Sequence, residues 1–290
     1  MKTAKYLTIL PLAVIGALYG TSPALAVPIL GSDLASFAVL GAAGVTNVPT
    51  STIGGNLGSA PNGSVGGGYI FTSGSLQANT PLAQNAQIQL DAAILAVDAF
   101  GPGTLITGGD LDAFQAGNGG TIGPGTYTVP FATTNLVGAL FLDGGGSNTA
   151  VWNFLFTSSL ITSITSNVSV TNVGDGALVG LYWTVASAAT LNGPTFAGNV
   201  LAHDLISSDG DLTIGCGRLL SATTQVTLIQ DNISIGCLGA GFGSGGFDQG
   251  VAIGSGGTGG SGGQVVPEPA TLALLGLGLL GLGFGRRRHG

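Results

Sequence analysis

Few residues in this 290-residue sequence have the chemistry needed for catalysis or metal binding. The only histidine outside the C-terminal segment is His203, which is followed by Asp204. Such a pair serves a catalytic triad only where the fold adds a nucleophile, so a solvated turn pair is favoured. Asp110-x-Asp112 and Asp209-x-Asp211 have calcium-ligand chemistry, but aspartate beside glycine is also typical of turns. We therefore expect no enzyme activity, no bound metal and no cofactor.

The N-terminus has the features of a secretory signal peptide. Lys2 and Lys5 precede an apolar run from Leu7 to Leu18, and Ala24-Leu25-Ala26 provides a cleavage motif. The sequence therefore predicts a signal peptide over residues 1–26 and an exported chain that begins at residue 27.

The C-terminal segment, residues 264–290, combines a short motif, an apolar run and a basic cluster. Pro267-Glu268-Pro269 precedes the uncharged run 270–285, which Arg286-Arg287-Arg288 follows. The run is slightly short for a membrane-spanning helix, but the arginines fit a cytoplasmic stop. This order resembles the PEP-CTERM sorting signal. The resemblance implies a transmembrane helix, recognition by a membrane-bound exosortase, and release into the exopolysaccharide-rich exterior of a Gram-negative bacterium.

Between these terminal segments the chain is acidic and almost free of bases. Residues 27–263 contain twelve aspartates and one arginine, Arg218, so their net charge is about −11. This charge favours solubility and disfavours contact with anionic membranes, so we expect membrane contact only through the C-terminal helix before processing. It also excludes a nucleic-acid-binding groove, which needs clustered lysine or arginine.

Residues 238–263 are half glycine, 13 of 26 positions, which predicts a flexible linker. Within them, residues 259–263 match the G-x-S-x-G pattern of a nucleophile elbow. No helical pattern follows that motif, so we interpret the match as chance. The linker would connect a folded domain, residues 27–237, to the sorting segment.

The folded domain is predicted to be mainly β, because short apolar and β-branched runs alternate with turn dipeptides such as Asp143-Gly144. Many short strands fit a β-solenoid or a sandwich. Residues 189–202 and 210–221 share a pattern of threonine, apolar and small residues at an offset of about 19, which suits stacked coils of a solenoid. Trp152 and Trp183 fit buried strand ends better than a platform for sugars.

One segment departs from the β pattern and predicts a helix over residues 81–100. Thr80 can cap its N-terminus, and Pro81 suits the first helical position. Apolar residues then recur at intervals of three and four, and Gly101-Pro102 ends the pattern.

Cys216 and Cys237 are the only cysteines in the sequence. In an exported chain a lone pair predicts one disulfide, which would close a loop of about 20 residues and contribute about 3 kcal/mol. It would tie the last strand to the coil before it.

Residues 31–234 resemble the bacterial and fungal ice-binding protein family. The resemblance is carried by 34–40 (LASFAVL), 53–58 (IGGNLG), 121–127 (TIGPGTY), 151–154 (VWNF), 181–185 (LYWTV), 196–202 (FAGNVLA) and 217–220 (GRLL). It implies a discontinuous, right-handed β-solenoid with one long helix packed alongside.

The same resemblance implies that one flat solenoid face, bearing outward threonine, serine, asparagine and alanine, contacts ice or ordered water. Seven threonines in or beside matching strands are candidates, although threonine is also simply a good strand former. These candidates are Thr50, Thr52, Thr121, Thr190, Thr195, Thr213 and Thr223. Thr195 and Thr213 occupy equivalent steps of adjacent coils, so we expect them to point the same way about one strand spacing apart.

Two functions fit these features. The first is an exported, non-enzymatic protein for ice binding or ice adhesion. The alternative is an extracellular matrix protein, associated with exopolysaccharide, that uses the same fold without affinity for ice.

Overall fold

The computed structural model describes residues 28–237 and 244–249. Over these residues the protein is mainly β, and every pair of neighbouring strands is parallel. The strands form three ladders, because the chain visits each ladder once per coil and then stacks the next coil on the last. The expectation of a mainly β chain is therefore confirmed.

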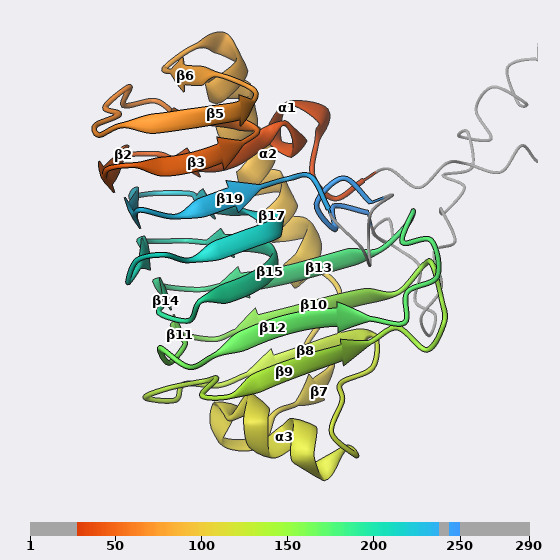
Figure 1. Ribbon diagram of the computed structural model, residues 1–290. Coiled ribbons are helices and arrows are strands. Elements are labelled where there is room, and N and C mark those ends of the chain that lie inside the picture. The colour runs from red at the N-terminus through yellow and green to blue at the C-terminus, as the bar shows by residue number, and fades with distance from the viewer. Residues whose placement is uncertain (1–27, 238–243, 250–290) are drawn as a thin grey trace, which may run out of the picture. The chain divides into compact units, whose positions relative to one another are not determined.

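The first ladder, which we call the front ladder, faces the viewer in Figure 1. From one end to the other its strands are β5 (Tyr69–Ser73), β3 (Ser51–Gly54), β19 (Asn232–Ser234), the first part of β17 (Thr213–Ser221), the first part of β15 (Thr195–Ala202), β12 (Asn167–Thr171) and β9 (Ala139–Asp143).

The second ladder, the helix-side ladder, shares β15 and β17 with the first. Its strands are β6 (Leu76–Ala78), β4 (Asn56–Ser59), β1 (Phe37–Gly41), the later parts of β17 and β15, β13 (Gly180–Val185), β10 (Val151–Phe156), β8 (Gly125–Val129) and β7 (Thr104–Leu105). β15 turns from one ladder to the other at Gly198, whose φ of +94° suits glycine and whose Cβ would lie 2.4 Å from Leu181 Cγ.

The third ladder is a separate five-stranded sheet. Its strands are β11 (Leu160–Ile161), β14 (Ala189–Leu191), β16 (Ile206–Ser208), β18 (Gln225–Ile229) and β2 (Gly44–Val48).

The order of strands in the stack does not follow the order in the chain. The N-terminal strands β1, β2 and β3 pair with β17, β18 and β19 near the C-terminus. In Figure 1 the red and orange strands therefore lie beside the blue ones, while the yellow segment lies at the opposite end. The coils are discontinuous in sequence, as the family resemblance implied.

The long helix α2 (Pro81–Asp98) forms where the sequence predicts it. Thr80 caps it by accepting a hydrogen bond from Ala83 N–H at 3.3 Å. Its buried alanines, with Leu90 and Val97, pack against Phe37, Leu40 and other apolar residues of the helix-side ladder. Two shorter helices, α1 (Ser32–Ala35) and α3 (Leu111–Gly117), and a 3-10 turn at Thr107–Gly109 were not predicted.

The apolar core lies between the three ladders. Four rings follow one another inside it along successive coils: Tyr127–Phe154 and Phe154–Trp183 stack with centroid separations of 5.2 and 4.4 Å, and Phe196 lies tilted against Trp183 at 5.0 Å. Trp183 and Trp152 are fully buried, and their indole N–H groups donate to the carbonyls of Ala197 and Ile122. The prediction of buried tryptophans is confirmed.

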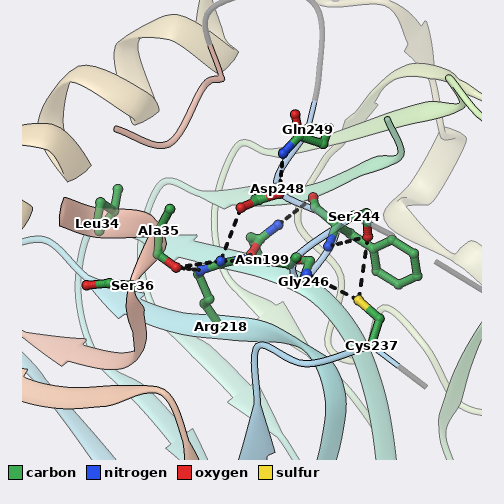
Figure 2. A network of polar contacts seen from close by, with 12 residues as sticks. Leu34, Ala35, Ser36, Asn199, Arg218, Cys237, Ser244, Gly246, Asp248 and Gln249 are labelled. Carbon is green, nitrogen blue, oxygen red and sulfur yellow. Dashed lines mark hydrogen bonds and ion pairs between the residues drawn. The ribbon is translucent and has the colours of Figure 1, made fainter. Parts of the chain in front are cut away.

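Arg218 is the only arginine among the described residues, and its side chain is just 1% exposed. It donates hydrogen bonds to the carbonyls of Ala35, Gly245 and Gly246 and to Asn199 Oδ1, and its Nη2 lies 3.3 Å from Asp248 Oδ2 (Figure 2). One buried cation thus joins the N-terminal segment to residues 244–249.

Residues 244–249 lie inside the expected linker but belong to the folded part. Phe247 is buried in the core, and its carbonyl accepts from Leu181 N–H at 3.0 Å. Tyr182 Oη donates to Asp248 O at 2.6 Å. The high glycine content suggested a tether, but Phe247 and Asp248 supply the apolar and ionic contacts that dock the segment. Residues 244–249 are therefore part of the folded domain.

Cys216 and Cys237 form the expected disulfide, which joins β17 to the segment after β19. The predicted signal peptide (1–26) and C-terminal helix lie outside the described residues. Among the helices that are described, none is long and apolar enough to cross a bilayer.

Candidate functional site

The front ladder carries one continuous column of outward side chains. The pairing of its strands places Thr195 opposite Thr213, Thr213 opposite Asn232, and Asn232 opposite Thr52. Asn167 and Ala139 extend the column at one end, and Ile70 extends it at the other. Neighbouring strands lie about 4.8 Å apart, so the seven side chains repeat at that interval. The expectation that Thr195 and Thr213 lie at equivalent steps of adjacent coils is confirmed.

The outward direction of this column follows from the alternation along each strand. In six of the seven strands the next residue is buried in the core, namely Ile53, Ile233, Ile214, Phe196, Val168 or Leu140, and in β5 it is the partly buried Phe71. The column residues themselves are partly or fully exposed. Gly54, Ser234, Gly215, Ala197 and Ser169 follow five of these buried positions and are small, whereas Phe141, which follows Leu140 in β9, is large and 43% exposed.

The face is almost free of charge. In the strands of the front ladder, Asp143 at the end of β9 is the only residue whose side chain is charged at neutral pH. Asp143 is partly exposed, and hydrogen bonds from Gly145 N–H and Asn172 Nδ2 lower the pKa of its carboxyl group. The columns therefore present hydroxyl, amide and methyl groups with little competing charge.

A buried carboxylate fixes the corner that leads into the front ladder. Asp231 accepts hydrogen bonds from Ser208 Oγ at 2.6 Å, Ile229 N–H at 3.0 Å and Leu212 N–H at 3.1 Å. Burial raises its pKa, although these three bonds oppose the shift. Its own N–H donates to Ser51 Oγ at 2.9 Å. The corner thus links three strands and holds the column in register.

The five-stranded sheet carries a second, shorter column. The pairing aligns Thr46, Thr227, Ser207, Thr190 and Ile161. Here hydroxyl groups bind one another along the ladder, with 3.1 Å between the Oγ1 atoms of Thr46 and Thr227 and 3.5 Å between Ser207 Oγ and Thr190 Oγ1. These hydroxyls satisfy each other in part, whereas in the front column Thr195 Oγ1 is buried without a hydrogen-bond partner, so Thr195 presents its methyl group.

The seven threonines proposed from sequence do not share one face. Thr52, Thr195 and Thr213 belong to the front column, and Thr190 belongs to the five-stranded sheet. Thr50, Thr121 and Thr223 lie in turns or irregular segments between strands. The sequence prediction missed Asn167 and Asn232 in the front column and Thr46 and Thr227 in the second. Asn167, Asn232 and Thr227 stand one step before a buried apolar residue of a short strand, and Thr46 stands one step after the buried Val45.

The residues with catalytic chemistry lie apart from both columns. His203 Nδ1 is 3.1 Å from Asp204 Oδ1, both side chains are exposed, and Thr223 Oγ1 also bonds Asp204, so the turn interpretation is confirmed. Asp110 caps α3 through Ala113 N–H, and Asp112 accepts from the N–H groups of Val137 and Gly138. These aspartates have structural partners. No cluster of three or more metal-ligating side chains occurs within residues 28–237 and 244–249.

Together the fold and the front column define a class: a protein of stacked parallel coils with one regular, nearly uncharged face suited to a periodic ligand. The chain belongs to the Ice-binding-like family, whose family model matches residues 39–234. A second family model, the PEP-CTERM protein-sorting motif, matches residues 265–288.

One relative covers nearly the whole chain, and a second covers about two thirds of it. An ice-binding protein of Nostoc sp. (strain HG1) is 31% identical over 294 residues, spanning 98% of this chain and 96% of the relative. One of Flavobacterium frigoris (strain PS1) is 29% identical and spans 69% and 74%, respectively.

Solved structures show the same fold. The crystal structure of an ice-binding protein from the Antarctic ascomycete Antarctomyces psychrotrophicus superposes with a TM-score of 0.60 at 28% identity, covering 71% of this chain and 98% of that one. An ice-binding protein from an Antarctic biological consortium gives a TM-score of 0.59 at 25% identity, covering 78% and 96%.

Proposed function

We propose that this protein is an exported, non-enzymatic ice-binding protein that folds as a right-handed β-solenoid and contacts ice through the front ladder. The observation that carries the proposal is the column of small polar and methyl-bearing side chains that runs across seven paired strands. Two curated relatives and two solved structures are named as ice-binding proteins. The contact residues would be Thr52, Thr195, Thr213, Asn167 and Asn232.

The physical basis is the match between a rigid grid and ordered water. Strand pairing fixes side chains at intervals of about 4.8 Å, so little side-chain entropy remains to be lost on contact. Hydroxyl and amide groups can hold water molecules in regular positions, and threonine methyl groups restrict the water between them. Charged groups would bind water in competing orientations, and the column has none.

The two ends of the chain would act as signals for export and sorting. We propose that residues 1–26 direct export and are removed, and that residues 264–290 place the chain in the inner membrane until an exosortase cleaves near Pro267-Glu268-Pro269. The match of the sorting motif to residues 265–288 supports this route. The protein would then act at the cell surface or in an exopolysaccharide matrix. Intact-mass analysis of the exported protein should find no Arg286–Arg288; a mass that includes them would contradict processing.

The face can be tested by placing the same bulky residue on each candidate ladder. Thr195→Tyr and Thr213→Tyr should each raise the concentration needed to inhibit ice recrystallisation at least about tenfold, equivalent to about 1.4 kcal/mol. Thr227→Tyr and Thr190→Tyr are matched controls on the five-stranded sheet and should leave inhibition unchanged. All four variants should melt close to the parent, because each side chain points away from the core.

The outcomes separate the alternatives. If only the five-stranded-sheet variants lose inhibition, ice contacts that sheet instead of the front ladder. If the unmutated protein shows neither recrystallisation inhibition nor thermal hysteresis at micromolar concentration, the function as a matrix protein replaces ice binding.

A further inference from the structure

The two ends of the stack of coils differ in whether other residues cover their edge strands. At one end α3 covers β9: Gln115 donates to Ala139 O at 2.8 Å and accepts from Phe141 N–H at 2.6 Å. Asp112 accepts from Val137 N–H at 2.7 Å and Gly138 N–H at 2.9 Å. These side chains take the place of a neighbouring strand. Figure 1 shows α3 at this end and β5 and β6 at the other.

The opposite end lacks such a cover among the described residues. β5 pairs only with β3, and β6 pairs only with β4. Alternate peptide groups of an edge strand point away from its partner, so both strands present free N–H and C=O groups. Leu76 is 49% exposed although it pairs with the fully buried Leu57. Val65, Tyr69 and Phe71, which pack on the core from this last coil, are likewise only partly buried.

This end also lacks the charges that protect other edges. No charged residue occurs between Asp33 and Asp91, a stretch that contains β1 to β6. Natural edge strands usually carry lysine, proline or inward charges that prevent pairing with another chain, and Tyr69–Ser73 and Leu76–Ala78 have none of these. The rest of the described protein carries all twelve of its aspartates and its one arginine.

We propose that this uncharged end is a self-association surface, on which a second copy of the chain docks end to end about a two-fold axis. A second copy is favoured by charge: two strongly acidic molecules repel each other in other orientations, whereas this contact joins two uncharged surfaces. A two-fold axis normal to the front ladder would pair β5 with the β5 of the second copy in antiparallel fashion and cover both exposed apolar ends.

This dimer is a weak one, because the end of a single coil offers less area than the interfaces of permanent dimers. Its consequence rests on the proposed function: the two front ladders would form one longer surface. The association itself is measured without ice, so failure of either proposal can be recognised separately.

The test is sedimentation equilibrium of residues 27–264, which contain the whole folded part, at concentrations from about 10 µM to 1 mM. The average mass should rise toward twice the monomer mass, and added salt should strengthen the rise by screening the acidic charges. Leu76→Lys should hold the mass at that of the monomer. Leu95→Lys is the matched control, because Leu95 is 71% exposed on α2, away from this end, and should associate as the parent does.

A second measurement guards against misfolding of the variant. In the unmutated protein, amide exchange of residues 69–78 should slow as concentration increases, while exchange on β9 should not change. A parent protein that stays monomeric at every concentration would overturn the proposal. So would association that Leu76→Lys leaves intact, or association that both lysine variants abolish equally.

Discussion

Replacing Arg218 with methionine would remove the only cation in the described part of the chain and leave its partners buried. The carbonyls of Ala35, Gly245 and Gly246, together with Asn199 Oδ1 and Asp248 Oδ2, would lose a donor (Figure 2). Methionine has a similar length, so packing changes little and the measurement isolates the polar network.

The expected cost follows from the burial of the group. Removing one partner from a buried ion pair costs roughly 3–5 kcal/mol, because the remaining charge is neither solvated nor paired. For a domain of this size each kcal/mol lowers the melting temperature by about 2–4 °C. We therefore expect Arg218→Met to lower the melting temperature by about 6–20 °C.

Calorimetry at fixed pH measures the change, and amide exchange shows where it acts. Exchange should accelerate first at residues 244–249, which Arg218 holds, and then at 32–36. Arg218→Met combined with Asp248→Asn should cost less than the sum of the single changes, because both remove the same ion pair. A melting temperature within about 3 °C of the parent would refute the view that this network holds the terminal segments.

Three further results are expected. Cys216→Ser with Cys237→Ser should cost about 3 kcal/mol, or about 6–12 °C in melting temperature, because the disulfide closes a 21-residue separation; an unchanged melting temperature would contradict this. The raised pKa of Asp231 means that the folded protein binds a proton at this carboxyl group more readily than the unfolded chain does. The free energy of unfolding should therefore fall as the pH rises from the pKa of the group in the unfolded chain, near 4, through its pKa in the folded protein, and then level off. In Asp231→Asn this component should vanish from chemical denaturation curves, and a pH dependence identical to the parent's would rule it out. Gln115→Leu should cost about 1–3 kcal/mol by leaving Ala139 O and Phe141 N–H of β9 without partners, with urea denaturation as the measure; a midpoint equal to the parent's would show that solvent satisfies both groups.

Local signals were sufficient to predict the long helix. Thr80, Pro81 and the helical spacing of apolar residues located α2 to within two residues at its end, because capping and periodicity act over a few residues. α3 was missed because its pattern is short and its stability comes from Asp112 and Gln115 contacting β9, more than twenty residues away. Residues 244–249 were missed for the same reason: their glycines suggested a linker, while their partners lie far away in the sequence, at 181, 182, 199 and 218.

The candidate face shows where sequence reasoning ends. Threonine is frequent both in strands and in turns, so residue type alone grouped Thr223, a turn residue bonded to His203 O, with Thr195. What separates them is the register between strands. Thr195 and Thr213 could be aligned because their coils follow one another in the chain. Asn232 and Thr52, which are neighbours in the same column, are 180 residues apart, and no repeat in the sequence connects them.

That long-range pairing depends on α2. The helix follows β6 at one end of the stack and leads to β7 at the other. The coils that come after β7 in the sequence therefore stack in the direction of the N-terminal coils, and the last of their strands, β19, pairs with β3. The helix packs on Phe37 and Leu40 of β1 and on Leu201 and Leu220 of β15 and β17, which lie on both sides of this junction. Its apolar face therefore holds the N-terminal coils in register with the last coil. A regular face on the front ladder thus requires a well-packed helix on the far side of the core, and a change that loosens α2 should interrupt the column between Asn232 and Thr52.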